Sequence, residues 1–123
     1  PSELVTMTVI RARCCELIGQ ALDRSDHGAA YFLLGLCSLL DVLLGHPMAQ
    51  VTQELPLDPE IRDALLGTDN PARRALDAVV HYEQGRWDES AAIAATLGIS
   101  PDTLPDAYAD ALGWARTLTR GAA

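Results

Sequence analysis

The stretch Tyr31-Phe32-Leu33-Leu34-Gly35-Leu36-Cys37-Ser38-Leu39-Leu40-Asp41-Val42-Leu43-Leu44-Gly45 decides the fold of this chain. Between residues 31 and 44, only Gly35, Ser38 and Asp41 interrupt the apolar side chains. A helix that is hydrophobic almost all the way round belongs in the middle of a core. The run is shorter than the roughly 20 apolar residues that span a bilayer. It therefore predicts a buried core helix that ends at Gly45.

Helical signals repeat along the rest of the chain, and strand signals do not. An amphipathic first helix is predicted from apolar residues spaced alternately by three and four: Met7, Ile10, Cys14, Leu17 and Ala21. A short helix is expected between Pro47 and Leu55. Two further helices are predicted to start where a capping residue precedes a proline, at Asp58-Pro59 and Asn70-Pro71, and to end at Gly67 and Gly85. Another is expected from Trp87 to a stop at Gly98, and the last follows Ser100-Pro101, where Pro105 in its first turn favours a late start or a bend. We predict an all-α, compact single-domain bundle of about six or seven helices.

Length and composition fit one domain over residues 1–123. The chain is 49% hydrophobic and 21% charged, and a chain of this length buries about two-thirds of its unfolded surface. No Gly/Ser-rich linker divides it. Because the chain starts at Pro1 without a methionine, we expect a fragment of a longer protein.

The net charge of −8 argues against phosphate-rich partners. An acidic surface repels nucleic acid and anionic lipid, so we expect neither nucleic acid nor a membrane as a partner. No N-terminal secretory signal is visible. The three cysteines are an odd number and include an adjacent pair, which is a poor disulfide site: Cys14, Cys15 and Cys37. We expect them to be small core residues of a cytoplasmic protein.

Several short segments occur in a characteristic order along the chain. They are Arg11-Ala12-Arg13-Cys14-Cys15-Glu16-Leu17, Phe32 to Asp41, Pro47-Met48, Glu54-Leu55-Pro56-Leu57, Tyr82-Glu83-Gln84-Gly85-Arg86-Trp87, and Tyr108 with Ala111, Trp114 and Ala115. Together they resemble the second half of an HDOD domain, as in bacterial EAL-HDOD signal-transduction proteins. The resemblance covers nearly the whole chain. It implies a link to cyclic di-GMP signalling, with the first half of the domain and any EAL-like domain upstream of Pro1.

HDOD domains are related to HD phosphohydrolases, whose helix reads hydrophobic-Gly-Leu-x-His-Asp. That His-Asp pair ligates the metal ion that activates water. Alignment on Gly35-Leu36 places Ser38 at the histidine and Leu39 at the aspartate. Leucine has no donor atom, serine is a weak ligand, and Asp41 comes two positions too late. The resemblance therefore implies a degenerate HD site with no metal, no cofactor and no enzyme activity.

The remaining polar candidates favour structural roles. The histidines lie far apart, without the spacing of metal ligands: His27, His46 and His81. Ser38 and Asp41 have no histidine near them in sequence, which argues against a catalytic pair. We expect Asp41 to form a buried ion pair with Arg11 or Arg13 of the first helix, and so to fix their packing.

Two tryptophans are candidate interface residues. Trp87 and Trp114, together with Tyr82 and Tyr108, are typical either of core anchors, the commoner case, or of a contact patch. Acidic residues repeat every four positions in the last helix and could face a basic partner: Asp102, Asp106 and Asp110.

Three functions remain open from the sequence. The favoured one is a non-catalytic signalling module that binds a protein partner or an upstream EAL-like domain of the same chain. The second is an HD-type, metal-dependent cyclic-dinucleotide phosphodiesterase, which needs ligands that this stretch does not supply. The third is a tetratricopeptide-like adaptor, suggested by Gly85-Arg86-Trp87-Asp88-Glu89 before an Ala-rich helix, although a solenoid needs about three repeats. A half-domain would also expose apolar surface, which favours a homodimer.

Overall fold

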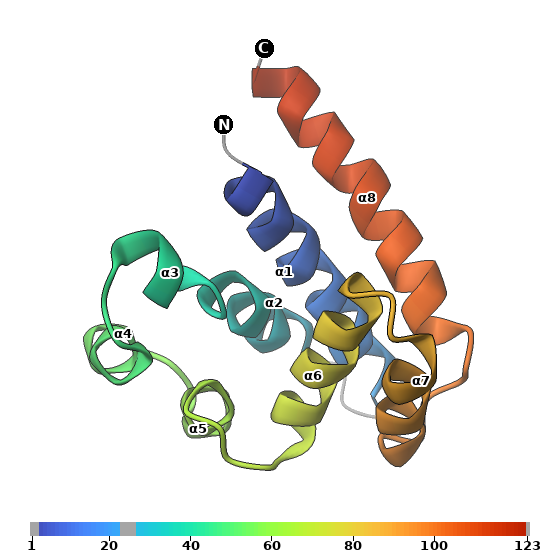
Figure 1. Cartoon of the computed structure of the whole chain (residues 1–123), viewed down its shortest axis with the longest axis horizontal. Coiled ribbons are helices and arrows are strands. Elements are labelled where there is room, and N and C mark those ends of the chain that lie inside the picture. Colours follow the sequence, from blue (N-terminus) through green and yellow to red (C-terminus); the bar gives the residue numbers. More distant parts are fainter. Residues whose placement is uncertain (1–2, 23–26, 123) are drawn as a thin grey trace.

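A computed structural model describes residues 3–22 and 27–122, with side chains described up to residue 118. This part of the chain forms eight helices and no strand (Figure 1). The helices are α1 (Glu3–Ala21), α2 (His27–Cys37), α3 (Leu40–Leu44), α4 (Met48–Glu54), α5 (Pro59–Leu65), α6 (Pro71–Glu83), α7 (Trp87–Thr96) and α8 (Thr103–Ala122). The prediction of an all-α fold is confirmed.

Helix α1 lies at the centre of the packing. It contacts α2 along one side and α8 along another, and α8 runs beside it in the opposite direction (Figure 1). Because two helices cover α1, its buried surface is wide. It includes Cys14 of the predicted stripe and residues outside that stripe: Thr8, Arg11, Ala12, Cys15, Ile18 and Gly19. Met7, at the predicted buried face, is 41% exposed. The core cluster draws its buried residues from α1, α2, α5, α6 and α8.

The predicted core helix over residues 31–44 is divided in two, and this accounts for the additional helix. Helix α2 ends at Cys37, and a turn at Ser38 and Leu39 precedes α3. The Ser38 hydroxyl donates to the Gly35 carbonyl at 2.7 Å, and such a bond competes with the helical backbone ladder. The prediction of burial holds for one side of α2, where Tyr31 and Leu34 are fully buried, whereas Leu33 is 42% exposed. It is wrong for α3, whose last three residues are exposed.

The predicted helix starts at Pro59 and Pro71 are confirmed. Pro59 and Pro71 are the first residues of α5 and α6, and Asn70 Oδ1 accepts the N–H of Arg73 at 2.8 Å. Helix α8 begins at Thr103, two residues after Pro101, which agrees with the expected late start. A turn precedes it, closed by the Thr103 N–H on the Ser100 carbonyl at 3.0 Å.

Helices α6 and α7 pack against each other after the turn at Gly85, whose φ of 76° suits glycine. The Ser90 hydroxyl of α7 donates to the Ala78 carbonyl of α6 at 2.8 Å in a buried contact. After this pair the chain continues into α8, which packs on α1. A stack of repeated helix pairs, as in a tetratricopeptide solenoid, does not form among the helices described.

Candidate functional site

The turn between α2 and α3 contains the two positions that align with the His-Asp pair. The Ser38 hydroxyl donates to the Gly35 carbonyl at 2.7 Å and accepts from Arg11 Nη1 at 3.1 Å. Its proton and one lone pair are therefore engaged within the protein. Leu39 is half-buried and carries no donor atom. The turn is a hydrogen-bonded joint between α1 and the end of α2.

Arg11 connects this joint to α6 through a buried ion pair. Arg11 Nη2 lies 2.7 Å from Glu83 Oε1, and Arg11 Nε lies 3.0 Å from Glu83 Oε2. The two side chains are 8% and 6% exposed. Such a two-point contact is the geometry in which a guanidinium binds a carboxylate best. Three segments of the chain therefore meet at one arginine.

The predicted pairing of Asp41 with Arg11 or Arg13 is wrong. Asp41 Oδ1 accepts the N–H of Val42 at 2.9 Å, in an exposed position at the start of α3. Arg13 pairs with Glu16 at 2.8 Å and with Asp110 of α8 at 3.1 Å. The turn after Cys37 is the physical reason, because it takes Asp41 off the helix face that meets α1.

The sequence did not predict that Glu83 is the partner of Arg11. It lies 72 residues away, so no helical spacing connects the two. Its place in the segment from Tyr82 to Trp87, one of those that carry the HDOD resemblance, was the available signal. A carboxylate that faces the core needs a buried cation beside it.

Close backbone packing fixes the joint. A Cβ added at Gly35 would lie 2.7 Å from both Ala12 Cα and the Arg11 carbonyl oxygen. Real Cβ atoms do not approach backbone that closely, so α1 and α2 touch here without a side chain between them. This contact holds the Arg11 side chain beside Ser38.

The three histidines lie in different elements: His27 begins α2, His46 precedes α4, and His81 is near the end of α6. Across residues 3–22 and 27–122, no three His, Cys, Asp or Glu side chains cluster closely enough to hold a metal ion. The expectation that the chain binds no metal remains a prediction.

The cysteines are core residues, as predicted. Cys14, Cys15 and Cys37 are free and at most 3% exposed. Desolvation raises the pKa of Cys14 to about 12 and also raises the pKa values of Cys15 and Cys37. Since the thiolate is the reactive form, these thiols are protonated and unreactive near neutral pH.

The two tryptophans belong to separate aromatic groups. Trp87 packs on Tyr82 with ring centroids 4.8 Å apart, and Tyr82 lies 5.0 Å from Tyr108. Trp114 meets Phe32 edge-on at 6.1 Å. Trp87 is 58% exposed, so the interpretation as a core anchor is wrong for this residue. Trp114 is half-buried.

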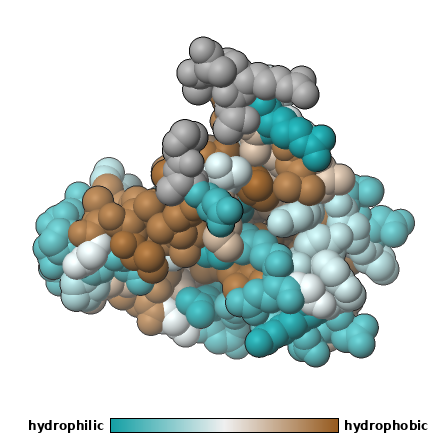
Figure 2. All heavy atoms as spheres, turned by 45° about the horizontal axis from the view of Figure 1, so that its top comes forward, coloured by the Kyte–Doolittle hydropathy of each residue, from teal (hydrophilic) through white to brown (hydrophobic). Residues whose placement is uncertain are grey.

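Two apolar regions are exposed among the described residues, and further exposed apolar residues lie elsewhere: Val5, Met7, Leu33, Leu66 and Leu118. The first, here called the α3 surface, consists of Val42, Leu43 and Leu44, which are 60%, 38% and 55% exposed. Figure 2 shows hydrophobic side chains gathered at the side of the molecule where α3 lies in Figure 1. Exposed apolar patches commonly mark interaction sites.

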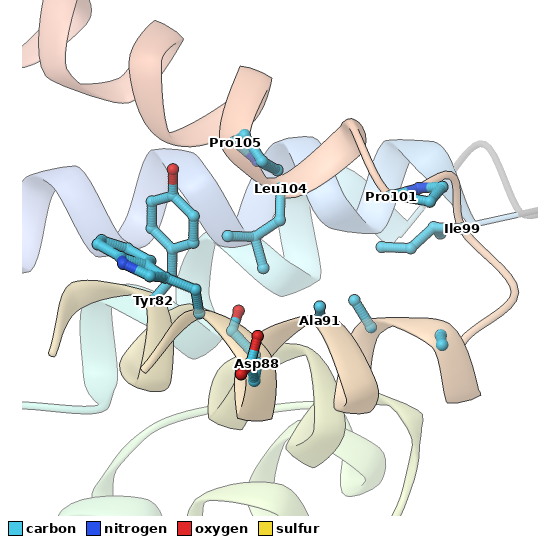
Figure 3. Close-up of a pocket in the computed structure, with 11 residues that line it drawn as sticks. Tyr82, Asp88, Ala91, Ile99, Pro101, Leu104 and Pro105 are labelled. Carbon is cyan, nitrogen blue, oxygen red and sulfur yellow. The ribbon is translucent and has the colours of Figure 1, made fainter. Parts of the chain in front are cut away.

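The second region is a hollow between α7 and the start of α8, here called the α7–α8 groove (Figure 3). Its volume is about 350 Å³. The lining residues are mostly apolar: Tyr82, Trp87, Asp88, Ser90, Ala91, Ala94, Ala95, Ile99, Pro101, Leu104 and Pro105. The figure shows Leu104 pointing from α8 toward α7, with Ile99 and Pro101 at one end.

Two curated relatives match the chain over most of its length. It is 34% identical over 116 residues, 94% of this chain, to the uncharacterized protein YuxH of Bacillus subtilis. It is 27% identical over 120 residues, 98% of this chain, to the cyclic di-GMP phosphodiesterase CdgJ of Vibrio cholerae. The chain spans 28% of the length of each relative. No protein-family model and no solved structure matches it. The chain is thus a distant homologue of part of a cyclic di-GMP signalling protein.

None of the described helices combines the length and the apolar character needed to cross a bilayer.

Proposed function

We propose that this chain is a non-catalytic signalling module of the HDOD type, which binds a protein partner or a further domain of a longer chain. The observation that carries the proposal is the chemistry at the two aligned positions. The Ser38 hydroxyl is bonded to Arg11 and Gly35, and Leu39 offers no ligand atom. Homology to CdgJ supports a role in cyclic di-GMP signalling.

The exposed apolar residues support the binding part of the proposal. Val42 and Leu44 project from a short helix whose chief neighbours are α2 and α4. Leaving such side chains in water costs roughly 25 cal/mol for each Å² of apolar area that a partner could cover. A partner with an apolar face would gain this free energy on binding.

The alternative is that the chain forms part of a metal-dependent cyclic-dinucleotide phosphodiesterase. It is favoured by the similarity to CdgJ, which is a cyclic di-GMP phosphodiesterase. Because this chain spans 28% of that relative, catalytic groups would then come from the remaining length.

A metal and activity measurement separates the two functions. The purified chain is dialysed without chelator, analysed for Mn, Fe, Co, Ni and Zn, and assayed for hydrolysis of cyclic di-GMP with added Mn²⁺. We expect less than about a tenth of a metal ion per chain and no hydrolysis. Stoichiometric metal together with hydrolysis would contradict the proposal and favour the phosphodiesterase.

Partner binding is tested by photo-crosslinking in the protein as its cell makes it. A crosslinking amino acid replaces Val42 on the α3 surface, or Gln50 on α4 as an exposed polar control. We expect a discrete protein-sized adduct, or an internal crosslink to another domain, from position 42 and not from position 50. Equal labelling from both positions would argue against a binding surface on α3.

A further inference from the structure

The α7–α8 groove has the features of a binding site for a helix. Its lining includes the exposed ring of Trp87 and the small side chains of Ala91 and Ala95. Leu104 and Ile99 form apolar walls (Figure 3). Tryptophan is among the residues most enriched at the centres of protein interfaces. Alanines let a partner approach the helix axis closely.

Few backbone N–H and C=O groups in the lining are free to bond a ligand, and this favours a helical occupant over an extended peptide. An extended peptide relies on main-chain hydrogen bonds to its receptor. Here the lining is mainly helical backbone, already bonded within α7, and Pro101 and Pro105 have no N–H. The Ser90 hydroxyl is already donated to Ala78. A helix satisfies its own backbone and needs only apolar contact.

The length of the groove sets the spacing of the contacts. From Trp87 to Ala95 is eight residues along α7, or about 12 Å at about 1.5 Å per residue. That distance is roughly two helical turns. An occupant helix would place apolar side chains at positions i, i+4 and i+7 along it.

The charge around the groove indicates which residues should flank the apolar stripe of the bound helix. All the lining residues except Tyr82 come from the segment of residues 86–106, which contains four acids and one base. The acids are Asp88, Glu89, Asp102 and Asp106, and the base is Arg86. Asp88 lines the groove itself, and Glu89 and Asp102 are exposed. Lysine or arginine beside the apolar stripe would meet these carboxylates.

We propose that the α7–α8 groove binds an amphipathic helix of a protein partner, with apolar residues at i, i+4 and i+7 and basic residues flanking them. The proposal names a partner class for the interaction module and in that sense rests on the proposed function. It uses a surface distinct from the α3 surface, and its test involves neither metal nor hydrolysis. The two proposals therefore fail by different results.

The test is an NMR titration of the intact chain with a synthetic helix-forming peptide of leucine and lysine. The indole N–H resonances of Trp87 and Trp114 report separately, and a Trp114→Phe variant assigns them. We expect saturable shifts at Trp87 and little change at Trp114. The same peptide with every lysine replaced by glutamate should bind at least about tenfold more weakly, because its charges repel Asp88.

Two variants of α7 make the test specific. Ala91→Leu combined with Ala95→Leu fills the groove, whereas Ala92→Leu adds an exposed leucine on α7 at a position that does not line it. All retain the charge of the chain, so unspecific attraction of a basic peptide is the same in each. We expect the filled groove to weaken binding by about tenfold or more and the control to leave it unchanged.

Other results would overturn the proposal. These are no shift at Trp87, equal binding by the filled and control variants, or equal binding of the lysine and glutamate peptides. A Trp87 shift that depends on protein concentration without peptide, and is lost in the filled variant, would assign the groove to a second copy of the chain instead.

Discussion

Arg11 of α1 and Glu83 of α6 face each other with two hydrogen bonds, of 2.7 and 3.0 Å, across 72 residues of sequence. Both side chains are almost fully buried. Removing two charges from water is costly, and such a pair is tolerated where its geometry is good and further bonds satisfy the groups. The third bond of Arg11, to Ser38, completes this arrangement. The pair therefore fixes how the end of α2 and the end of α6 meet α1.

Replacing Glu83 with glutamine should lower the free energy of unfolding by about 3 kcal/mol or more. The change leaves the buried Arg11 guanidinium without a counter-charge, and breaking a buried pair by removing one partner carries a cost of this order. Urea denaturation followed by far-UV circular dichroism measures the loss.

Asp41→Asn is the control for that pairing. Asp41 accepts the N–H of Val42 in an exposed contact at the start of α3, so its replacement should change the free energy of unfolding by no more than about 0.5 kcal/mol. A loss as large as that of Glu83→Gln would mean that Arg11 pairs with Asp41 after all.

Gly35→Ala should destabilise the chain by about 3 kcal/mol. The added methyl would lie 2.7 Å from the backbone of Ala12 and Arg11, so α1 and α2 would have to separate, and overpacking of this kind carries a cost of that size. Thermal or urea unfolding tests this. Unchanged stability would show that the two helices are not in backbone contact.

Gly113→Ala is the matched control, with the opposite sign. Gly113 lies within α8, is exposed, and has no atom within 4 Å of an added Cβ. Alanine should stabilise the helix by about 0.5 to 1 kcal/mol, because it loses less backbone entropy on folding.

The buried thiols should make the chain less stable above about pH 9. Folding raises the pKa of Cys14 to about 12, whereas a thiol in the unfolded chain has a pKa of about 8.5. Between these two pH values the folded state keeps the proton of Cys14 and the unfolded state releases it. The stabilisation is complete below the unfolded pKa and is lost as pH rises toward the folded one. The free energy of unfolding should fall by about 1.4 kcal/mol per pH unit for each fully buried thiol.

Denaturation in urea with a non-thiol reductant, between about pH 9 and about pH 10, measures this slope. The chain contains no lysine, which keeps the number of other groups that titrate there small. Cys14→Ala should make the slope shallower by about 1.4 kcal/mol per pH unit. An unchanged slope in that variant would mean that the thiol of Cys14 ionises in the folded chain.

The order of the helices could be predicted from the sequence because their boundaries are local. Pro59, Pro71 and the glycine turns act on the backbone within a few residues, so the predicted positions hold. The break at Ser38 could not be predicted in the same way. Nothing in an apolar run shows that a serine will bond Gly35 and Arg11, since that depends on how α1 packs against α2.

Pairings and exposure were harder to predict than boundaries. Glu83 reaches Arg11 through the packing of α6 on α1, which no periodicity records. Trp87 has the spacing of a buried aromatic residue, yet its side chain is 58% exposed at the start of α7. The α7–α8 groove, which Trp87 lines together with Leu104 of α8, depends on how these helices lie in space, which no motif of the sequence records.

The last prediction concerns the homodimer that exposed apolar surface favours. If copies of the chain associate through the α3 surface, Leu44→Lys should raise the dimer dissociation constant by about tenfold or more, because a charge would be buried at the interface. Leu66→Lys is the matched control, since Leu66 is 49% exposed and follows α5 outside this surface. Sedimentation velocity over a range of concentrations measures both variants, and neither should lose more than about 0.5 kcal/mol of stability. Equal weakening by both would indicate unspecific association, and a monomer at every concentration would leave the α3 surface to a different partner.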